Sequence, residues 1–251
     1  MKLDAVQKIT LSGLLVALVI IFTRFLSIQN IPVMPFVRIS LGPALIIFSS
    51  ILLGPIYGMA VGALSDILGI LLRPNELGYS INPLYTLIYG LLGLLPGLLI
   101  ILIKKIKSEK LLLFVNIITL GALFLFVTIF TLFDIIFSFE IYQKILIIVI
   151  TFLLMTGTFF GIRFIDKYLK KKSEDTPLEY SVYHISFVSL IVEFFVLLIL
   201  NSIVKAFMFE VSFLLVFFMQ GIVFFINIAL DSLFVTYLLF ISRKVLRPRG
   251  S

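Results

Sequence analysis

The sequence predicts an all-α protein that crosses a membrane several times, and three observations support this prediction. Hydrophobic residues make up 61% of the 251 residues and charged residues only 13%, which leaves too little polar surface to cover a water-soluble domain. The apolar runs are about 17 to 30 residues long, as membrane-spanning helices require. Alternating segments of about ten residues, typical of membrane β-barrels, are absent.

Eight apolar runs, separated by charged or Gly- and Pro-containing segments, are expected to form helices that each cross the membrane. The expected helices cover residues 8–27, 40–53, 56–72, 83–103, 111–133, 143–165, 183–204 and 212–242. Only Leu-Gly-Pro joins the second helix to the third. These two helices are therefore expected to be antiparallel neighbours.

The distribution of basic residues predicts the orientation. With eight spans, fifteen of the twenty Lys and Arg residues fall on the side that holds both termini, and five fall on the other side. Because cytoplasmic segments carry the excess of Lys and Arg, both termini are expected in the cytoplasm. The net charge of +7 thus reflects topology in a lipid bilayer, and we expect no nucleic-acid partner.

The composition divides the chain into a body and an inserted hairpin. Residues 1–103 are rich in Gly, Pro and Ser, whereas 111–165 are nearly uniform Leu, Ile, Phe and Thr. A hairpin that enters and leaves on the cytoplasmic side can be inserted without inverting the helices after it. The predicted units are the first four body helices (1–107), the inserted hairpin with basic linkers (108–180), the last two body helices (181–245) and a tail that cloning could have added (246–251).

One face of the third helix is lined by small residues, and an acid lies beside it. At helical spacing the small residues share one strip that another helix can approach closely: Gly58, Gly62, Ser65 and Gly69. Asp66 is interpreted as a structural group satisfied by a hydroxyl or an arginine, with direct substrate contact as the alternative. The cations expected on the same outer side are Arg24, Arg38 and Arg73. The acid and an arginine are therefore expected to meet near one outer cavity.

The last two helices carry further polar residues within apolar sequence. Gln220, Asn227 and Asp231 share one stripe, because steps of seven and four residues return to nearly the same angle. Gln220 is nearest the outer end and is a candidate ligand contact, whereas Asn227 and Asp231 are interpreted as structural. Glu193 is also interpreted as structural and is expected to be protonated or hydrogen-bonded, because a bare charge is costly there.

The first helix carries Gly13 and Ala17, a pair of small residues four positions apart. Such pairs allow close approach of another helix. The partner could be a helix of another subunit or an internal neighbour, and the residues alone favour neither.

Several kinds of chemistry are not supported by the sequence. There is no cysteine and only one histidine, His184, so we expect no metal site, no cofactor and no catalytic residues. No G-x-x-x-x-G-K-[ST] run is present, so ATP hydrolysis would have to come from a partner. An intramembrane enzyme is the weakest hypothesis, because the acids are isolated.

Five segments resemble one family of transport proteins. They are FTRFLSI (22–28), FVRISLGPALI (36–46), LLGPIYGMAVGALSDILGILLRP (52–74), LYTLIYGLLGLLPGLL (84–99) and EFFVLLILNSIVKAF (193–207). Together with Gln220 and Asn227 they resemble the folate-type substrate-binding S components of energy-coupling-factor (ECF) vitamin transporters. Two departures are the glycine at position 13, where the family usually has alanine, and the inserted hairpin.

The resemblance implies a six-helix subunit in the bacterial plasma membrane that captures a vitamin on its outer side. It implies that Gly13 and Ala17 contact a transmembrane coupling subunit, and that two separate ATPase subunits drive release inward. The protein itself is then not an enzyme. A membrane scaffold or morphogenesis protein of similar shape is the alternative.

Folate is the expected ligand, with pantothenate or another water-soluble vitamin as the alternative. A pterin with an aminobenzoyl-glutamate tail needs flat apolar walls, amide groups and cations for its carboxylates. The candidate substrate-binding residues are Arg24, Phe36, Arg38, Tyr79, Asn82, Tyr85, Asn201 and Gln220.

Overall fold

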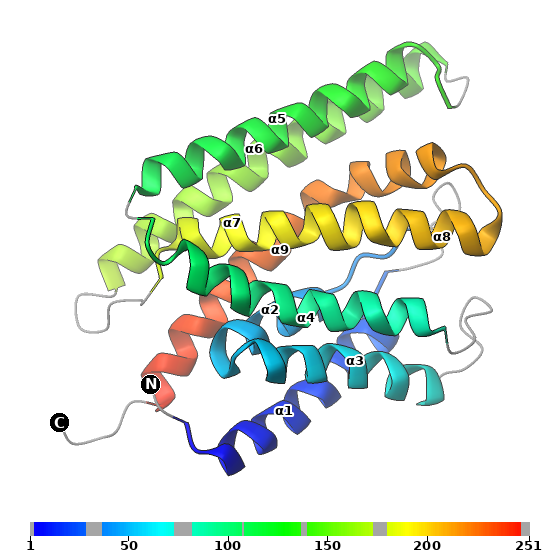
Figure 1. Cartoon of the computed structure of the whole chain (residues 1–251). Helices are drawn as coiled ribbons and strands as arrows, with labels where there is room; N and C mark the ends of the chain where they lie inside the picture. Colours follow the sequence, from blue (N-terminus) through cyan, green and yellow to red (C-terminus); the bar gives the residue numbers. More distant parts are fainter. Residues whose placement is uncertain are drawn as a thin grey trace.

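The computed structural model is a bundle of helices that run side by side (Figure 1). It describes residues 3–28, 37–72, 82–106, 108–136, 140–172 and 180–246. Within these ranges the only strand-like feature is an isolated bridge between Ile28 and Ile39. The predicted all-α class is confirmed.

Each of the eight expected helices has a counterpart. The elements are α1 (Ala5–Ile20), η1 (Ile21–Phe25), α2 (Gly42–Leu53), α3 (Pro55–Leu72), α4 (Pro83–Ile103), α5 (Glu109–Leu132), α6 (Ile141–Lys172), α7 (Val182–Val192), η2 (Glu193–Leu200), α8 (Asn201–Phe209) and α9 (Phe213–Leu246). The segments η1 and η2 are π-helical turns, so α1–η1 and α7–η2–α8 are continuous rods. The sequence did not predict these π turns.

The short helix α2 differs from the others. Seven helical rods in the described residues are long and apolar enough to cross a membrane. The 12 residues of α2 extend only about 18 Å, which is less than the hydrocarbon thickness. Nearly all of its side chains are buried, with Ala44, Ile46 and Ile47 fully enclosed. It is therefore a central packing helix among α1, α3, α4 and α9, rather than an eighth complete span.

Helices α3 and α4 pack backbone to backbone. A Cβ atom added to Gly58 would collide with the carbonyl oxygen of Gly93, and one added to Gly62 would collide with that of Tyr89. This pair of helices makes the most extensive contact in the described parts of the bundle. The small-residue strip predicted on the third helix is confirmed as a close-packing surface at these two glycines.

The α5–α6 hairpin packs against α7 and α9, on the side of the bundle away from α1 and α3 (Figure 1). Leu120 and Leu123 of α5 join a buried cluster with Leu190 and Phe224. Polar contacts also connect the hairpin to the body. It therefore covers one side of the body and leaves a long apolar face outward.

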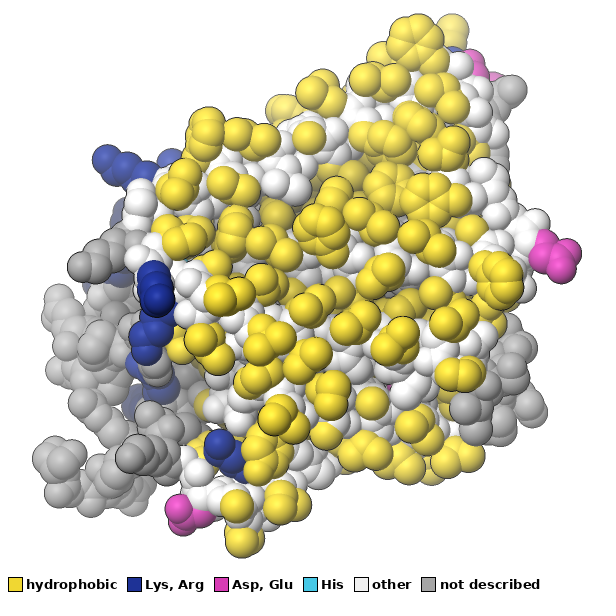
Figure 2. All heavy atoms as spheres, viewed as in Figure 1, with side chains coloured by type: hydrophobic (Ala, Val, Ile, Leu, Met, Phe, Trp, Pro, Cys, Tyr) yellow, Lys and Arg dark blue, Asp and Glu magenta, His cyan; other side chains and the backbone are white. Residues whose placement is uncertain are grey.

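The two ends of the bundle differ in charge. In Figure 2 a broad hydrophobic surface is bordered along one edge by Lys and Arg side chains. Lys104, Lys105, Lys110 and Lys171 are exposed at this end, where α1 also starts and α9 ends (Figure 1). The apolar surface and the seven spanning helices agree with a multi-pass membrane protein. The cytoplasmic placement of this end remains a prediction.

Candidate functional site

A cavity of about 100 Å³ lies toward the end of the bundle opposite the basic edge. Its walls come from η1, the start of α2 with the residues before it, the second half of α3, the first turns of α4, the η2–α8 rod and the first half of α9. Segments far apart in the sequence thus converge on one cavity. The residues in its wall are polar and charged as well as apolar, although the surroundings are hydrophobic.

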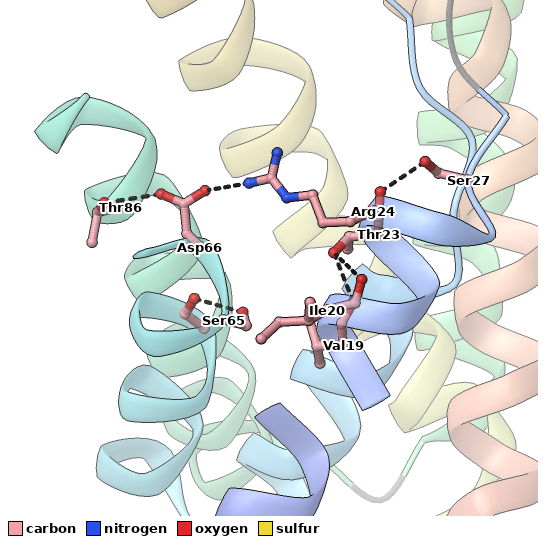
Figure 3. A network of polar contacts seen from close by, with 9 residues as sticks. Val19, Ile20, Thr23, Arg24, Ser27, Ser65, Asp66 and Thr86 are labelled. Atoms are coloured by element: carbon pink, nitrogen blue, oxygen red, sulfur yellow. Dashed lines mark hydrogen bonds and ion pairs between the residues drawn. The ribbon is translucent and has the colours of Figure 1, made fainter. Parts of the chain in front are cut away.

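A buried ion pair forms one wall of the cavity (Figure 3). The Arg24 Nη2 atom lies 3.3 Å from Asp66 Oδ1, and Thr86 Oγ1 donates a 2.9 Å hydrogen bond to Asp66 Oδ2. The two charged side chains are only 6% and 3% exposed. A buried carboxylate needs such partners, because an uncompensated charge is costly in a low dielectric. The pair joins η1, α3 and α4.

Local structure explains how Arg24 reaches this position. Arg24 lies in the π turn η1, where Thr23 Oγ1 donates to Val19 O at 2.7 Å and ties down the preceding turn. Gly69 faces the guanidinium, and a Cβ atom there would lie 2.8 Å from Arg24 Nε. The missing side chain at position 69 therefore makes room for the arginine.

The charges in the cavity wall are unequal. Three cations contribute to it, Arg24, Arg38 and Lys205, against two carboxylates, Asp66 and Glu193. Lys205 is 7% exposed and Glu193 is 1% exposed. Because Asp66 is already paired with Arg24, the remaining positive charge can favour an anionic ligand.

Amide and hydroxyl groups connect α8 to α9 across the cavity. The Asn201 side-chain amide donates to Gln220 Oε1 at 3.3 Å, and Gln220 Nε2 donates to Ser202 Oγ at 3.0 Å. Asn227 lies two turns further along α9 and also lines the cavity. These groups can both donate and accept hydrogen bonds, which suits a ligand with heteroatoms on its ring edges.

Aromatic side chains supply flat walls. Tyr85 and Tyr89 come from successive turns of α4, and Phe224 comes from α9. Such rings can stack on a planar ligand. Tyr89 and Phe224 were not among the sequence candidates, although the one-turn spacing from Tyr85 was a usable signal for Tyr89.

The structure brings together five of the eight candidate substrate-binding residues. The five that line the cavity are Arg24, Arg38, Tyr85, Asn201 and Gln220. Asn82 is outside this wall: its Oδ1 accepts the Leu84 N–H at 2.9 Å and caps α4, and its Nδ2 lies 3.1 Å from Met208 Sδ. Phe36 and Tyr79 lie outside the described residues.

The four residues interpreted as structural occupy two kinds of position. Asp66, Glu193 and Asn227 line the cavity, so they are available to a ligand as well as to the fold. Asp231 is 1% exposed and is not part of the wall. It lies behind the cavity against Glu193. The sequence placed these residues in the interior but could not distinguish a cavity wall from the packed core behind it.

Gly13 and Ala17 lie on the face of α1 that points away from the rest of the bundle. Both residues are exposed, and a Cβ atom at Gly13 would meet no described atom within 4 Å. Among the described residues no internal neighbour uses this small-residue surface. The alternative of an internal helix contact is therefore not supported.

Comparisons with known proteins identify the family of this chain. A family profile described as "ECF-type riboflavin transporter, S component" matches residues 3–165. The folate transporter FolT of Clostridium novyi (strain NT) is 34% identical over 109 residues, which are 42% of this chain and 56% of the relative. The alignment thus spans just over half of that relative's length. No solved structure matches. The chain belongs to the family of ECF-type riboflavin transporter S components, which are vitamin-binding transport subunits of the bacterial cell membrane.

Proposed function

We propose that this subunit captures folate in the cavity from the outer side of the membrane. The observation that supports folate is the charge of the wall, in which Arg24, Arg38 and Lys205 accompany only two carboxylates. Folate carries two carboxylates on its glutamate tail, and charge-assisted hydrogen bonds to cations are the strongest polar contacts available to them. The name of the C. novyi relative points to the same vitamin.

Other vitamins fit this wall less well. Riboflavin, which the family description names, could stack on Tyr85 and Tyr89 but has no anionic group for Arg38 and Lys205. Pantothenate has one carboxylate but no aromatic ring. Of these three vitamins, only folate can use the aromatic walls, the amides of Asn201 and Gln220, and the cations together.

Binding can be tested by calorimetry on the detergent-purified subunit with folate, riboflavin and pantothenate. We expect folate to bind most tightly, and we expect Arg38→Ala and Gln220→Ala each to weaken it at least tenfold, as the loss of a charged or buried hydrogen bond implies. Lys144→Ala is the matched control, because Lys144 is a cation outside the cavity that pairs with Asp134. If riboflavin bound more tightly than folate, the assignment of folate as the ligand would be wrong. If none of the three vitamins bound, the scaffold hypothesis would be favoured.

Delivery into the cell is proposed to use a separate coupling subunit and two ATPase subunits, as the family resemblance implies. The sequence contains no P-loop motif, which agrees with an ATPase supplied by a partner. The exposed surface at Gly13 and Ala17 is the proposed docking face for the coupling subunit. Ala17→Leu should abolish folate uptake by cells while leaving folate affinity unchanged.

The control for docking is Gly121→Leu. Gly121 lies on α5 and, like Gly13, would place a Cβ atom within 4 Å of no described atom. Uptake should survive this change. Equal loss of uptake in both variants would mean that added bulk anywhere on the surface is harmful, and the proposed docking face would be wrong.

A further inference from the structure

Two carboxyl groups meet in the interior behind the cavity. Glu193 opens the π turn η2, and Asp231 lies on α9; each side chain is 1% exposed. The two carboxyl groups are within hydrogen-bonding reach of each other. The two helices contact each other and run in opposite directions, since Ser186 pairs with Ser232 and Asn201 with Gln220. Side chains lean toward the N-terminus of their own helix, so these two groups lean toward one another.

Apart from the Ala44 N–H, which points toward Asp231, no donor in the described chain forms a hydrogen bond to the oxygen atoms at this point. These atoms are Glu193 Oε1, both carboxylate oxygens of Asp231, Asn227 Oδ1 and Ser189 Oγ. Ser189 lies one turn before Glu193, and Asn227 lies one turn before Asp231. The five oxygen atoms therefore come from two pairs of residues, one on the α7–η2 rod and one on the facing helix α9. Buried polar atoms are rarely left without a partner, and a cluster of them points to a bound water, ion or proton.

The surrounding charges do not neutralise this pair. No described Lys or Arg forms an ion pair with Glu193 or Asp231, and Arg24 across the cavity is bound to Asp66. Arg38 and Lys205 share the cavity wall with Glu193, as do Tyr85 and Tyr89 of α4. The Ala44 N–H in the first turn of α2 also points toward Asp231. The dipole of this one N–H group cannot balance two adjacent negative charges on Glu193 and Asp231, because like charges in a low dielectric repel strongly.

We propose that Glu193, Asp231 and Asn227 form a binding site for one small monovalent cation, a proton or a sodium ion. A proton would join the two carboxyl groups in a single O–H···O hydrogen bond. A sodium ion would be held by the same oxygen atoms, since hard cations prefer carboxylate, amide and hydroxyl oxygens. The described residues contain no group of three or more His, Cys, Asp or Glu side chains that could hold a metal, so a divalent ion lacks the carboxylates it needs.

The site has a consequence for the cavity. Glu193 belongs to the cavity wall, so a cation bound behind it removes a negative charge that would otherwise face the ligand. This step rests on the proposed binding of folate. It implies that cation and folate raise each other's affinity, because such coupling is reciprocal.

The first test does not involve the vitamin. The full-length subunit in detergent is heated in sodium chloride and in choline chloride at equal ionic strength, each from mildly acidic to mildly alkaline pH. Anything that binds only the folded state raises the unfolding temperature. A rise of several degrees in sodium at fixed pH identifies a sodium ion. A rise on acidification that is the same in both salts identifies a proton.

The variants assign the response to these residues. Glu193→Gln and Asp231→Asn keep the shape and remove one charge, so each should abolish the dependence on sodium or pH. Asp166→Asn is the matched control: this buried acid of α6 pairs with Lys170 and lies away from the site, so the response should persist. A parent protein that responds to neither sodium nor pH overturns the proposal, and this holds even where a variant fails to fold. A response that survives in Glu193→Gln also overturns it.

Folate titrations under the same conditions separate this proposal from the proposed function. If sodium or acidic pH raises the unfolding temperature but folate does not bind, the proposed cation site is supported and the proposed ligand is wrong. Folate binding that is tighter in the occupied state, and independent of sodium and pH in Glu193→Gln, is the expected result. Folate affinity that the cation does not change would remove the coupling between the two sites.

Discussion

The four N-terminal helices and the α5–α6 hairpin are both apolar, yet they pack in different ways. Helices α3 and α4 meet at glycines whose added Cβ atoms would strike backbone, whereas Gly121 and Gly157 of the hairpin would meet no described atom within 4 Å. The hairpin instead attaches through large side chains such as Leu123 against Phe224. No described residue of α5 or α6 lines the cavity. Close backbone packing and the ligand site therefore occur together in the body, and the hairpin is peripheral to both.

Among the variants considered, the largest loss of stability is expected when the ion pair between η1 and α3 is broken. Arg24→Met leaves Asp66 buried without its ion-pair partner, and breaking a buried pair in this way costs about 3–5 kcal/mol of unfolding free energy. Thermal unfolding in detergent should show a large fall in Tm, and calorimetry should show weak folate binding.

A double variant distinguishes stability from binding. Arg24→Met with Asp66→Leu removes both charges, and exchange of a buried pair for apolar side chains is often neutral. We expect the Tm to recover while folate affinity stays low. Recovery of affinity together with the Tm would show that Arg24 serves only the fold.

Much of this difference between regions could be predicted from the sequence. The helices followed from hydropathy, the close packing followed from the spacing of Gly58 and Gly62, and the hairpin was distinguished by its composition. These features repeat along one helix or one run, so a local pattern suffices to find them.

The pairings across helices could not be predicted. Asp66 had three candidate cations, and the choice of Arg24 depends on the π turn and on the gap left by Gly69. Glu193 and Asp231 are 38 positions apart in the sequence, and their contact depends on the axial offset between the α7–η2–α8 rod and the antiparallel helix α9. The packing of the whole bundle sets this offset, so it cannot be predicted from a local sequence pattern.

The next largest loss of stability is expected at the glycine contact between α3 and α4, and substitutions at two glycines test it. Gly93→Ala forces a methyl group against the backbone of Gly58, and overpacking of this kind costs about 1–3 kcal/mol. Gly121→Ala makes the same chemical change on α5 where space is open. Thermal unfolding should show a clear decrease in Tm only for Gly93→Ala. Equal Tm values would mean that the α3–α4 contact is looser than its glycines indicate.

A smaller effect is expected at Gly69. The Cβ atom of Gly69→Ala would lie 2.8 Å from Arg24 Nε, at the mobile end of a side chain. The guanidinium can shift by a few tenths of an ångström, so the Tm should change little. Folate affinity should fall several-fold, because the shifted group is part of the cavity wall. Gly90→Ala is the control, since its Cβ would meet only side-chain atoms at 3.8 Å and beyond.

The smallest effect is expected where the hairpin meets the body. Thr158 Oγ1 on α6 lies 3.0 Å from the carbonyl oxygen of Phe225 on α9 and 2.8 Å from that of Leu154 on its own helix. Thr158→Val keeps the shape and removes this shared donor, at a cost of about 0.5–1.5 kcal/mol. Folate affinity should not change, because the contact lies outside the cavity wall. A tenfold loss of affinity would instead show that the hairpin controls the position of α9, and with it Gln220 and Asn227.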